Sequence, residues 1–273
     1  MKNASKLMGA LRVRPGKPVR LKDVDPRDAS LLGDRAEAEA QTTADAAEID
    51  VLQDRLYAEK TRAFLVILQG TDTSGKDGAI RKVFSETDPL GIQTTAFGRP
   101  SEEELAHDFL WRIHRACPPR GVIGIFNRSH YEDVLVVKVR GLAPAETVET
   151  RYDQINAFER MLAESGTTIL KFMLYISKEE QAERLQARLD DPTKRWKFNS
   201  GDLDDRIHWD DYIAAYETAL HRCSTKHAPW YVIPADRKWA RNAAIAAIVR
   251  ATLEALDPQY PTPDWDPAEF RVV

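Results

Sequence analysis

The stretch FLVILQGTDTSGKDGAI, residues 64–80, decides the fold of this chain. Apolar residues typical of a buried strand lead directly into the pattern Gly-x-x-x-x-Gly-Lys at residues 70–76, and a helical pattern follows. Glycine lets the backbone bring its N–H groups close to phosphate oxygens, while the helix N-terminus and Lys76 add positive charge. The order strand, glycine loop, helix therefore predicts a phosphate-binding loop; an ordinary strand–helix turn is the alternative.

Composition narrows the class of protein. The chain has 273 residues, of which 43% are hydrophobic and 30% charged, as in globular proteins with a sizeable core. It has no long apolar run and no secretory signal, and its two cysteines are too few for a disulfide framework, so we expect a cytoplasmic protein without a membrane span. A net charge of −4 argues against nucleic acid as a partner and requires a local basic patch for any long anion.

Strand and helix patterns alternate along the chain. Strands are predicted at residues 64–69, 92–97, 121–126, 168–176 and 230–233. This alternation predicts an α/β fold, a parallel five-stranded sheet between two layers of helices. Ligands of such sheets bind at the carboxyl ends of the strands, so the loops after these five strands are where chemistry is expected.

The remaining segments give further structural expectations. Residues 1–33 lack a sustained period and are interpreted as an irregular arm, whereas residues 34–60 predict an amphipathic helix. The helix after the glycine loop is expected to run to about residue 86, and a capping box at Ser101 and Glu104 to begin a helix that continues through Cys117. We expect residues 1–60 to form an N-terminal arm and helix, and residues 61–273 the main domain.

The glycine loop departs from its common form in one respect. Asp77 follows Lys76 where Ser or Thr usually binds Mg²⁺, so another donor is needed. Asp72, inside the loop, is the candidate metal ligand, with an Asx-turn as the alternative. The residues expected to contact phosphate in this loop are Gly70, Thr73, Ser74, Gly75, Lys76, Asp77 and Gly78.

The third strand ends in Asn127 and Arg128. Asn127 is neutral where a phosphate-loop enzyme usually has a magnesium-binding Asp. Arg128 is expected to bind phosphate through its planar guanidinium, although a structural ion pair is the alternative. His114 and His130 have no partner at a spacing typical of catalysis or metal binding, and we interpret them as surface or supporting residues.

A polar segment rich in basic and aromatic residues follows the fourth strand and its helix. Residues 184–208 predict a lid that closes cations over phosphates, and a solvated charged face is the alternative. The cations expected to face phosphate are Arg184, Arg188, Lys194 and Lys197.

Taken in order, five segments resemble the family-2 polyphosphate kinases, with an Asn-Arg-Ser sequence similar to that of class III members. They are GTDTSGKDGAI, EEELAHDFLWRIH, GVIGIFNRSHYEDVLV, DPTKRWKFNSGDLDDRIHWDDY and APWYVIPADRKWARN. The resemblance implies a P-loop kinase-like phosphotransferase domain with a helical lid. It also implies Mg²⁺-dependent transfer of phosphoryl groups from inorganic polyphosphate to AMP and ADP, giving ADP and ATP.

The resemblance also implies roles for individual residues. Asp72, Lys76 and Arg128 match the essential loop and strand-end residues, and Lys194 and Lys197 match positions that line the polyphosphate channel.

Four positions are candidates for nucleotide binding. Asn127 and Glu132 match positions near the acceptor nucleotide that differ between classes of the family, and Arg99 and Asp108 are further candidates, with packing as the alternative for Asp108. One departure is Gly98, where the family pattern has Lys, so one phosphate or nucleotide contact is missing unless Arg99 replaces it.

Other functions remain open from the sequence. An ATP-dependent nucleoside or nucleotide kinase would share the loop and the lid, and a non-catalytic nucleotide-binding protein would share the loop. The helix at residues 34–60 and the arm before it suggest a homodimer or homotetramer by analogy.

Overall fold

The computed structural model describes residues 2–272 and contains the predicted parallel sheet. Its five strands lie in the order β2 (Ile92–Ala96), β3 (Ile123–Asn127), β1 (Ala63–Gln69), β4 (Thr167–Tyr175) and β5 (Trp230–Pro234). In the centre, Val66 of β1 pairs with Ile125 on one side and Leu170 on the other. The glycine loop therefore leaves the middle strand, between two neighbours whose carboxyl ends open on the same edge.

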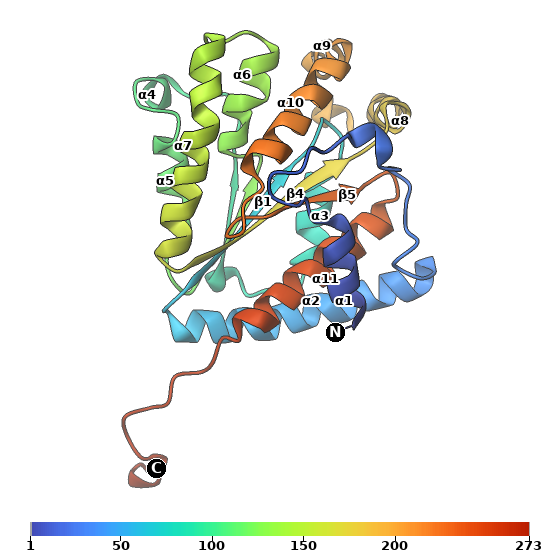
Figure 1. The fold of residues 1–273 in the computed structure, drawn as a ribbon. Helices are drawn as coiled ribbons and strands as arrows, with labels where there is room; N and C mark the ends of the chain where they lie inside the picture. The colour runs from blue at the N-terminus through green and yellow to red at the C-terminus, as the bar shows by residue number, and fades with distance from the viewer. Residues whose placement is uncertain (1, 273) are drawn as a thin grey trace.

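Helices cover both faces of the sheet, as Figure 1 shows. The longest helices on one face are α2 (Arg35–Glu59) and α11 (Lys238–Leu256), with α1 (Lys2–Leu11) and α3 (Lys76–Val83) beside them. The other face carries α5 (Trp111–Ala116), α7 (Ala145–Glu164) and α10 (Trp209–Cys223), with the short α6 (Val136–Val139). The predicted three-layer arrangement is confirmed.

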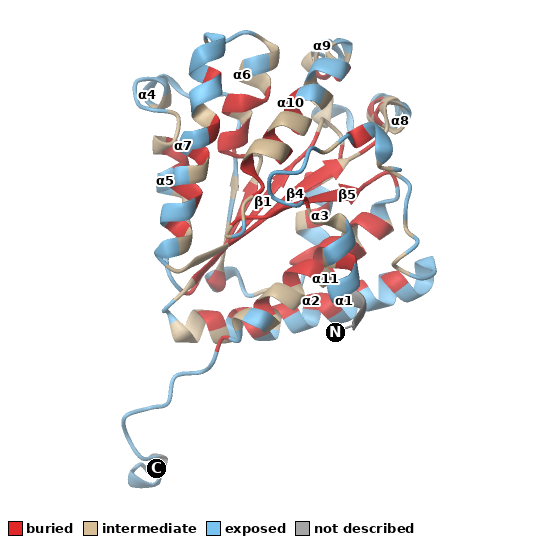
Figure 2. Ribbon diagram, viewed as in Figure 1, coloured by how far each residue is buried: buried red, intermediate tan, exposed pale blue. Residues whose placement is uncertain are grey.

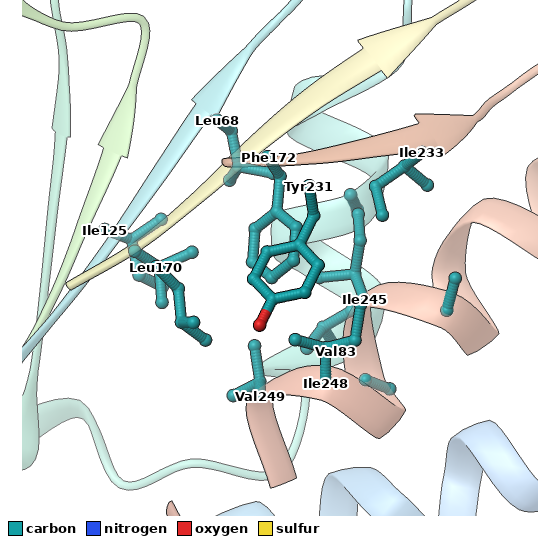
Figure 3. Close-up of a cluster of buried hydrophobic side chains, with 14 of the residues drawn as sticks. Leu68, Val83, Ile125, Leu170, Phe172, Tyr231, Ile233, Ile245, Ile248 and Val249 are labelled. Carbon is teal, nitrogen blue, oxygen red and sulfur yellow. The ribbon is translucent and has the colours of Figure 1, made fainter. Parts of the chain in front are cut away.

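Successive side chains of β1 pack alternately against the helices on the two faces of the sheet. Phe64, Val66 and Leu68 belong to the hydrophobic cluster with α2, α3 and α11, whereas Leu65 and Ile67 pack toward α5 and α7. Figure 2 shows β1, β4 and β5 largely buried, whereas the residues of the edge strand β2 are intermediate or exposed. Figure 3 shows Phe172 and Tyr231 packed on Ile245 and Val249 of α11. Each such side chain contributes about 1.5–3 kcal/mol when fully buried, so the core holds the strand ends in fixed positions.

The N-terminal segment differs from the predicted irregular arm. Residues 2–11 form α1, whose Leu7 is buried in the core with α11, and Val13 N–H donates to the carbonyl of Trp230 (2.9 Å). Apolar residues at positions 4, 7, 8 and 11 have helical spacing, a short pattern that the prolines and glycines after it obscured. The predicted boundary at residue 60 stays a prediction, although α1 and α2 share the core of the sheet.

The predicted helix from Ser101 to Cys117 was wrong in its length. The capping box at Ser101 and Glu104 is present, but α4 covers only Glu102–Leu105. The Asp108 carboxylate then accepts the N–H of Leu110 (2.9 Å), a local turn that competes with the helix, which begins again as α5. Two other boundaries differ slightly from the prediction: α3 ends at Val83 rather than at about residue 86, and β3 begins at Ile123 rather than at residue 121.

The segment predicted as a lid lies above the carboxyl ends of the strands. It consists of α8 (Lys178–Asp190), a 3-10 turn at Arg195–Lys197 and α9 (Gly201–Ile207) (Figure 1). Trp196 and Ile207 are largely exposed on it. After α11 the chain extends away from the body. Across residues 2–272, no helix has the length and apolarity needed to cross a membrane.

Candidate active site

The loop between β1 and α3 forms the floor of the site. Gly70 and Gly75 have φ values of +152° and +98°, a region that residues with side chains rarely adopt. A Cβ on Gly75 would lie 1.8 Å from Nη1 of Arg241, and one on Gly70 would lie 2.6 Å from the Leu174 carbonyl oxygen. Backbone conformation therefore favours glycine at both positions, and at Gly70 the close contact with backbone requires it as well.

Lys76 begins α3 and turns back over this loop. Its Nζ donates to the carbonyl oxygens of Gly70 (2.8 Å) and Thr71 (3.4 Å), and the side chain is buried. Burial, followed by the charge of Arg128, lowers the pKa of Lys76 to about 8. Burial therefore disfavours the charged ammonium group, and an anionic ligand beside it would stabilise the charged form.

Arg128 joins the third strand to the glycine loop. It follows β3 with a φ of +65°, unusual for a residue with a side chain, and its Nη2 contacts the Asp72 carboxylate. Its Nη1 lies 3.1 Å from Glu132 Oε2, and these two carboxylates, Glu132 first, raise the pKa of Arg128 although burial opposes them. Three of the predicted site residues, Asp72, Arg128 and Glu132, therefore meet in one ion-pair network.

Two arginines hold the outer side of the loop. Arg184 donates to the carbonyls of Thr73, Ser74, Ala235 and Asp236 and to the Glu180 carboxylate, which occupies all five of its N–H groups. Arg184 thus ties the phosphate loop to the loop after β5, and its predicted phosphate contact stays a prediction.

Arg241 on α11 has a different environment. Its Nη1 lies 3.3 Å from the Ser74 carbonyl oxygen, and burial followed by the charge of Arg184 lowers its pKa to about 10. Its other hydrogen-bond acceptor is the Asn242 amide oxygen. Arg241 was not predicted, because nothing in the local sequence places residue 241 beside residue 75.

The lid contributes cations that are partly paired. Arg188 donates to Asp202 Oδ2 (3.1 Å) and to the Lys197 carbonyl (3.0 Å). Lys194 Nζ lies 2.6 Å from Asp191, and Lys197 Nζ lies 4.9 Å from the centre of the Trp196 ring. These contacts lie within the lid itself and leave its cations directed toward the loop.

All of these elements enclose one cleft of about 640 Å³. Nine basic and three acidic side chains line it, a surplus of six positive charges on a chain whose net charge is −4. The basic residues are Lys76, Arg81, Arg128, Arg184, Arg188, Lys194, Lys197, Lys238 and Arg241, and the acidic ones Asp72, Asp77 and Asp202. The local basic patch that the sequence required for a long anion is present.

The loop also offers unused hydrogen-bonding groups. Within residues 2–272, the buried hydroxyl groups of Thr71, Thr73 and Ser74 have no hydrogen-bond partner. A buried polar group without a partner is costly, so phosphate oxygens at this position would relieve that cost.

The predicted nucleotide-binding residues separate into two groups. Asn127 lines the cleft, where its amide donates to Asp77 (2.7 Å). Glu132 is connected to the cleft by its hydrogen bond with Arg128. Arg99 and Asp108 are exposed and belong to the segment after β2, outside the cleft lining. The structure therefore brings together the loop, strand-end and lid residues, but not these two.

Comparison with known proteins agrees with this geometry. The family model described as polyphosphate kinase 2 (PPK2) matches residues 33–261. The chain belongs to the polyphosphate kinase 2 family.

Individual relatives match over most of their length. The chain is 51% identical over 259 residues to an AMP/ADP-polyphosphate phosphotransferase of Meiothermus ruber, covering 94% of this chain and 97% of the relative. It is 44% identical over 222 residues to an ADP-polyphosphate phosphotransferase of Rhodopseudomonas palustris, with 77% of each chain covered. The crystal structure of polyphosphate kinase 2 from Arthrobacter aurescens TC1 superposes with a TM-score of 0.93 at 45% identity, covering 96% of this chain and 94% of that one.

The donor set of this PPK2 chain fits a magnesium ion bound together with phosphate. Across residues 2–272 there is no cluster of three or more His, Cys, Asp or Glu side chains that could hold a metal without substrate. Asp72 and Asp202 both line the cleft, and burial followed by the charge of Asp72 raises the pKa of Asp202 to about 6. Mg²⁺ typically binds one or two carboxylates plus substrate phosphates, so this pair suits it.

The position of His130 excludes the surface alternative of its sequence interpretation. His130 is fully buried, and its Nε2 lies 3.2 Å from Glu159 of α7, so it is a core residue rather than a surface one. The carboxylate of Glu159, 29 residues further along the chain, gave no local signal. His114 is exposed, which agrees with the alternative that it is a surface residue.

Proposed function

We propose that this PPK2 chain transfers phosphoryl groups from inorganic polyphosphate to AMP and ADP. The observation that carries the proposal is the cleft at the glycine loop, with six more basic than acidic side chains. A donor and an acceptor that are both phosphate anions require such a surplus, because their mutual repulsion must be neutralised before they approach. The printed activity of the Meiothermus relative supports both acceptors.

The reaction is a direct in-line displacement. An oxygen of the nucleotide's terminal phosphate attacks the terminal phosphorus of polyphosphate, and the bond from that phosphorus to the bridging oxygen of the chain breaks. AMP becomes ADP, or ADP becomes ATP, and the polyphosphate leaves one unit shorter. No protein side chain becomes phosphorylated, because alignment and charge neutralisation are enough for this transfer.

Residues of the cleft have separate tasks in this displacement. Lys76 and Arg128 neutralise charge on the moving group, and the hydroxyl groups and backbone N–H groups of residues 70–78 position it. Asn127 and Glu132 bind the nucleotide at the cleft, whereas Arg99 and Asp108 lie outside the cleft lining and contact the nucleotide only if it extends to the segment after β2. Asp72, with Asp202, would hold Mg²⁺, and the ion would supply positive charge that neutralises phosphate oxygens.

The lid side chains complete the donor site. Arg188, Lys194 and Lys197 face the cleft from α8 and the turn after it, opposite the glycine loop. We propose that they bind polyphosphate, while Arg184 supports the loop and reaches the phosphates only if its backbone contacts rearrange.

The enzyme is proposed to work in the cytoplasm as a homodimer or homotetramer. Cys117 and Cys223 are both free thiols, which fits a reducing compartment. Size-exclusion chromatography with light scattering measures the assembly.

An assay of the purified chain tests the activity. With Mg²⁺, polyphosphate and AMP we expect ADP and then ATP, and with EDTA we expect neither. The alternative is an ATP-dependent nucleoside or nucleotide kinase. Products formed only when ATP is the donor would favour that alternative and contradict the proposal.

A further inference from the structure

A second cleft opens beside the catalytic one. It has a volume of about 550 Å³ and lies between the first turns of α2, the end of α3 and the start of α11. Lys238 lines both clefts, and the same two helices, α3 and α11, provide walls to each. Arg81 faces the first cleft and its neighbour Lys82 faces the second. The two spaces are therefore successive parts of one surface path.

The side chains of this second cleft suit an anion. Its basic residues are Arg35, Lys82 and Lys238, and its other hydrogen-bonding side chains include Trp239 and Asn242. Among residues 2–272, the one hydrogen-bond contact of the Lys82 ammonium group is a long one, 3.4 Å from Nζ to the Thr43 hydroxyl. Burial, and then the neighbouring cation Arg184, lowers the pKa of Lys238, so an anion beside it would be favourable.

Two acidic residues also line this cleft, so its basic side chains exceed the acidic ones by one, and both carboxylates have hydrogen-bond partners in the free protein. The Asp236 carboxylate is buried and accepts the N–H and hydroxyl of Ser177 at 2.8 Å each, with Arg27 Nε 3.4 Å away. Glu39 pairs with Arg35 at 3.0 Å across one turn of α2. This second pair is exposed, so it is weak and exchanges easily for a contact between Arg35 and a polyanion.

The geometry points to a site for the distal units of the polyphosphate donor in this second cleft. The inference rests on the proposed function in one respect, that the donor is a chain longer than the part held at the glycine loop. Only the terminal unit reacts, so the rest of the chain must leave the catalytic cleft along a surface. The path past Lys238 to Lys82 and Arg35 offers successive cations, and repeated phosphate units bind such a row without a fixed register.

The test is the double variant Arg35→Ala/Lys82→Ala. Both side chains lie on helix surfaces and are exposed, so the fold is retained. We expect KM for long-chain polyphosphate to rise roughly tenfold with kcat unchanged, because two phosphate contacts are lost. KM for tripolyphosphate, which has only two units beyond the one that reacts, is expected to stay the same. The matched control, Arg160→Ala/Lys226→Ala, removes two exposed cations elsewhere and should change neither KM.

Direct binding gives a second readout that does not need turnover. The affinity for long-chain polyphosphate falls as salt concentration rises, and we measure the slope of log affinity against log salt concentration. In the double variant this slope should be smaller in magnitude by about 1.4, because each of the two lost contacts to a flexible single chain contributes about 0.7. An equal rise in KM for both donor lengths, or equal effects of the control pair, would overturn the inference. If the wild-type chain formed no product from any polyphosphate, the proposed function would fail, and the binding slope would still decide on this site.

Discussion

The chain contains two groups of buried or partly buried charges that are built in opposite ways. In the core between β4 and α7, Lys171 Nζ lies 2.5 Å from Glu159, 2.8 Å from the Tyr131 hydroxyl and 2.7 Å from the Cys223 carbonyl oxygen. This core ion pair is fully buried and each charge has its partner. The catalytic cleft, at the carboxyl ends of the same strands, has six basic side chains in excess.

The difference separates charges that serve the fold from charges that serve a ligand. A buried ion pair with satisfied hydrogen bonds adds little net stability but costs much when one partner is removed. A surplus of cations is a cost in the free protein that only a bound anion relieves. Substitutions in the two groups should therefore be distinguished by which property they change, stability or activity.

The largest effect is expected from breaking the core ion pair. Lys171→Met leaves Glu159 charged and buried, which should lower the free energy of unfolding by about 3–5 kcal/mol. Urea unfolding measures this loss, and the kcat of the protein that remains folded should be unchanged. The double variant Lys171→Met/Glu159→Leu should recover most of the stability. If the double variant were as unstable as the single one, packing rather than charge would explain the loss.

Removing a cleft cation should lower the activity without lowering the stability, the reverse of the result expected for the core ion pair. Lys76→Met is expected to lower kcat roughly 10²–10³-fold, because it removes a preorganised donor to the moving phosphoryl group. The free energy of unfolding should stay the same or rise, since a buried cation has been removed from beside Arg128. Lys226→Met, at an exposed position, is the control. A Lys76→Met enzyme that turns over at the wild-type rate would refute this assignment.

An anion should stabilise the folded protein through the cleft and not through the core ion pair. Tripolyphosphate at about 100 times its dissociation constant should stabilise by about 2.7 kcal/mol. In a chain of this size each kcal/mol raises Tm by about 2–4 °C. The double variant of the core ion pair should gain the same amount at equal saturation, whereas Lys76→Met should gain less at equal concentration. Thermal unfolding at a series of concentrations measures both, and a gain unaffected by Lys76→Met would place the anion elsewhere.

The smallest effect on stability is expected from an ion pair near the surface of the molecule. Glu59 and Arg62 pair at the end of α2, and this hydrogen bond lowers the pKa of Glu59 to about 2 from 4.5. Because the folded-state pKa is lowered, the contribution is present above pH 4.5 and is lost as the pH falls toward 2. We expect Glu59→Gln to cost about 0.5–1 kcal/mol at neutral pH. The difference from wild type, measured by urea unfolding, should vanish near pH 2; a constant difference would mean that charge is not its cause.

Local patterns in the sequence were sufficient for much of the site. Gly70, Gly75 and Lys76 are close in sequence, so their spacing alone predicted the loop between β1 and α3, and its binding of phosphate stays a prediction. Arg128 and the lid cations were found because loops after parallel strands meet at one edge of the sheet. The broken helix after Ser101 was missed because a single carboxylate, that of Asp108, redirects the backbone where helical spacing otherwise continues.

By itself, the sequence determined the α/β class, the glycine loop and the basic lid, because these depend on periodicity and on residues near one another in the chain. Only the tertiary structure decided that Arg241 packs against Gly75, that four of the five Arg184 N–H groups donate to backbone carbonyls, and that Glu159 pairs with Lys171. Whether a charged side chain has a partner of opposite charge depends on residues from distant segments of the chain. The degree of burial sets the free energy of that ion pair. The sequence showed where cations occur; the packing of helices on the sheet decided which of them remain available to phosphate.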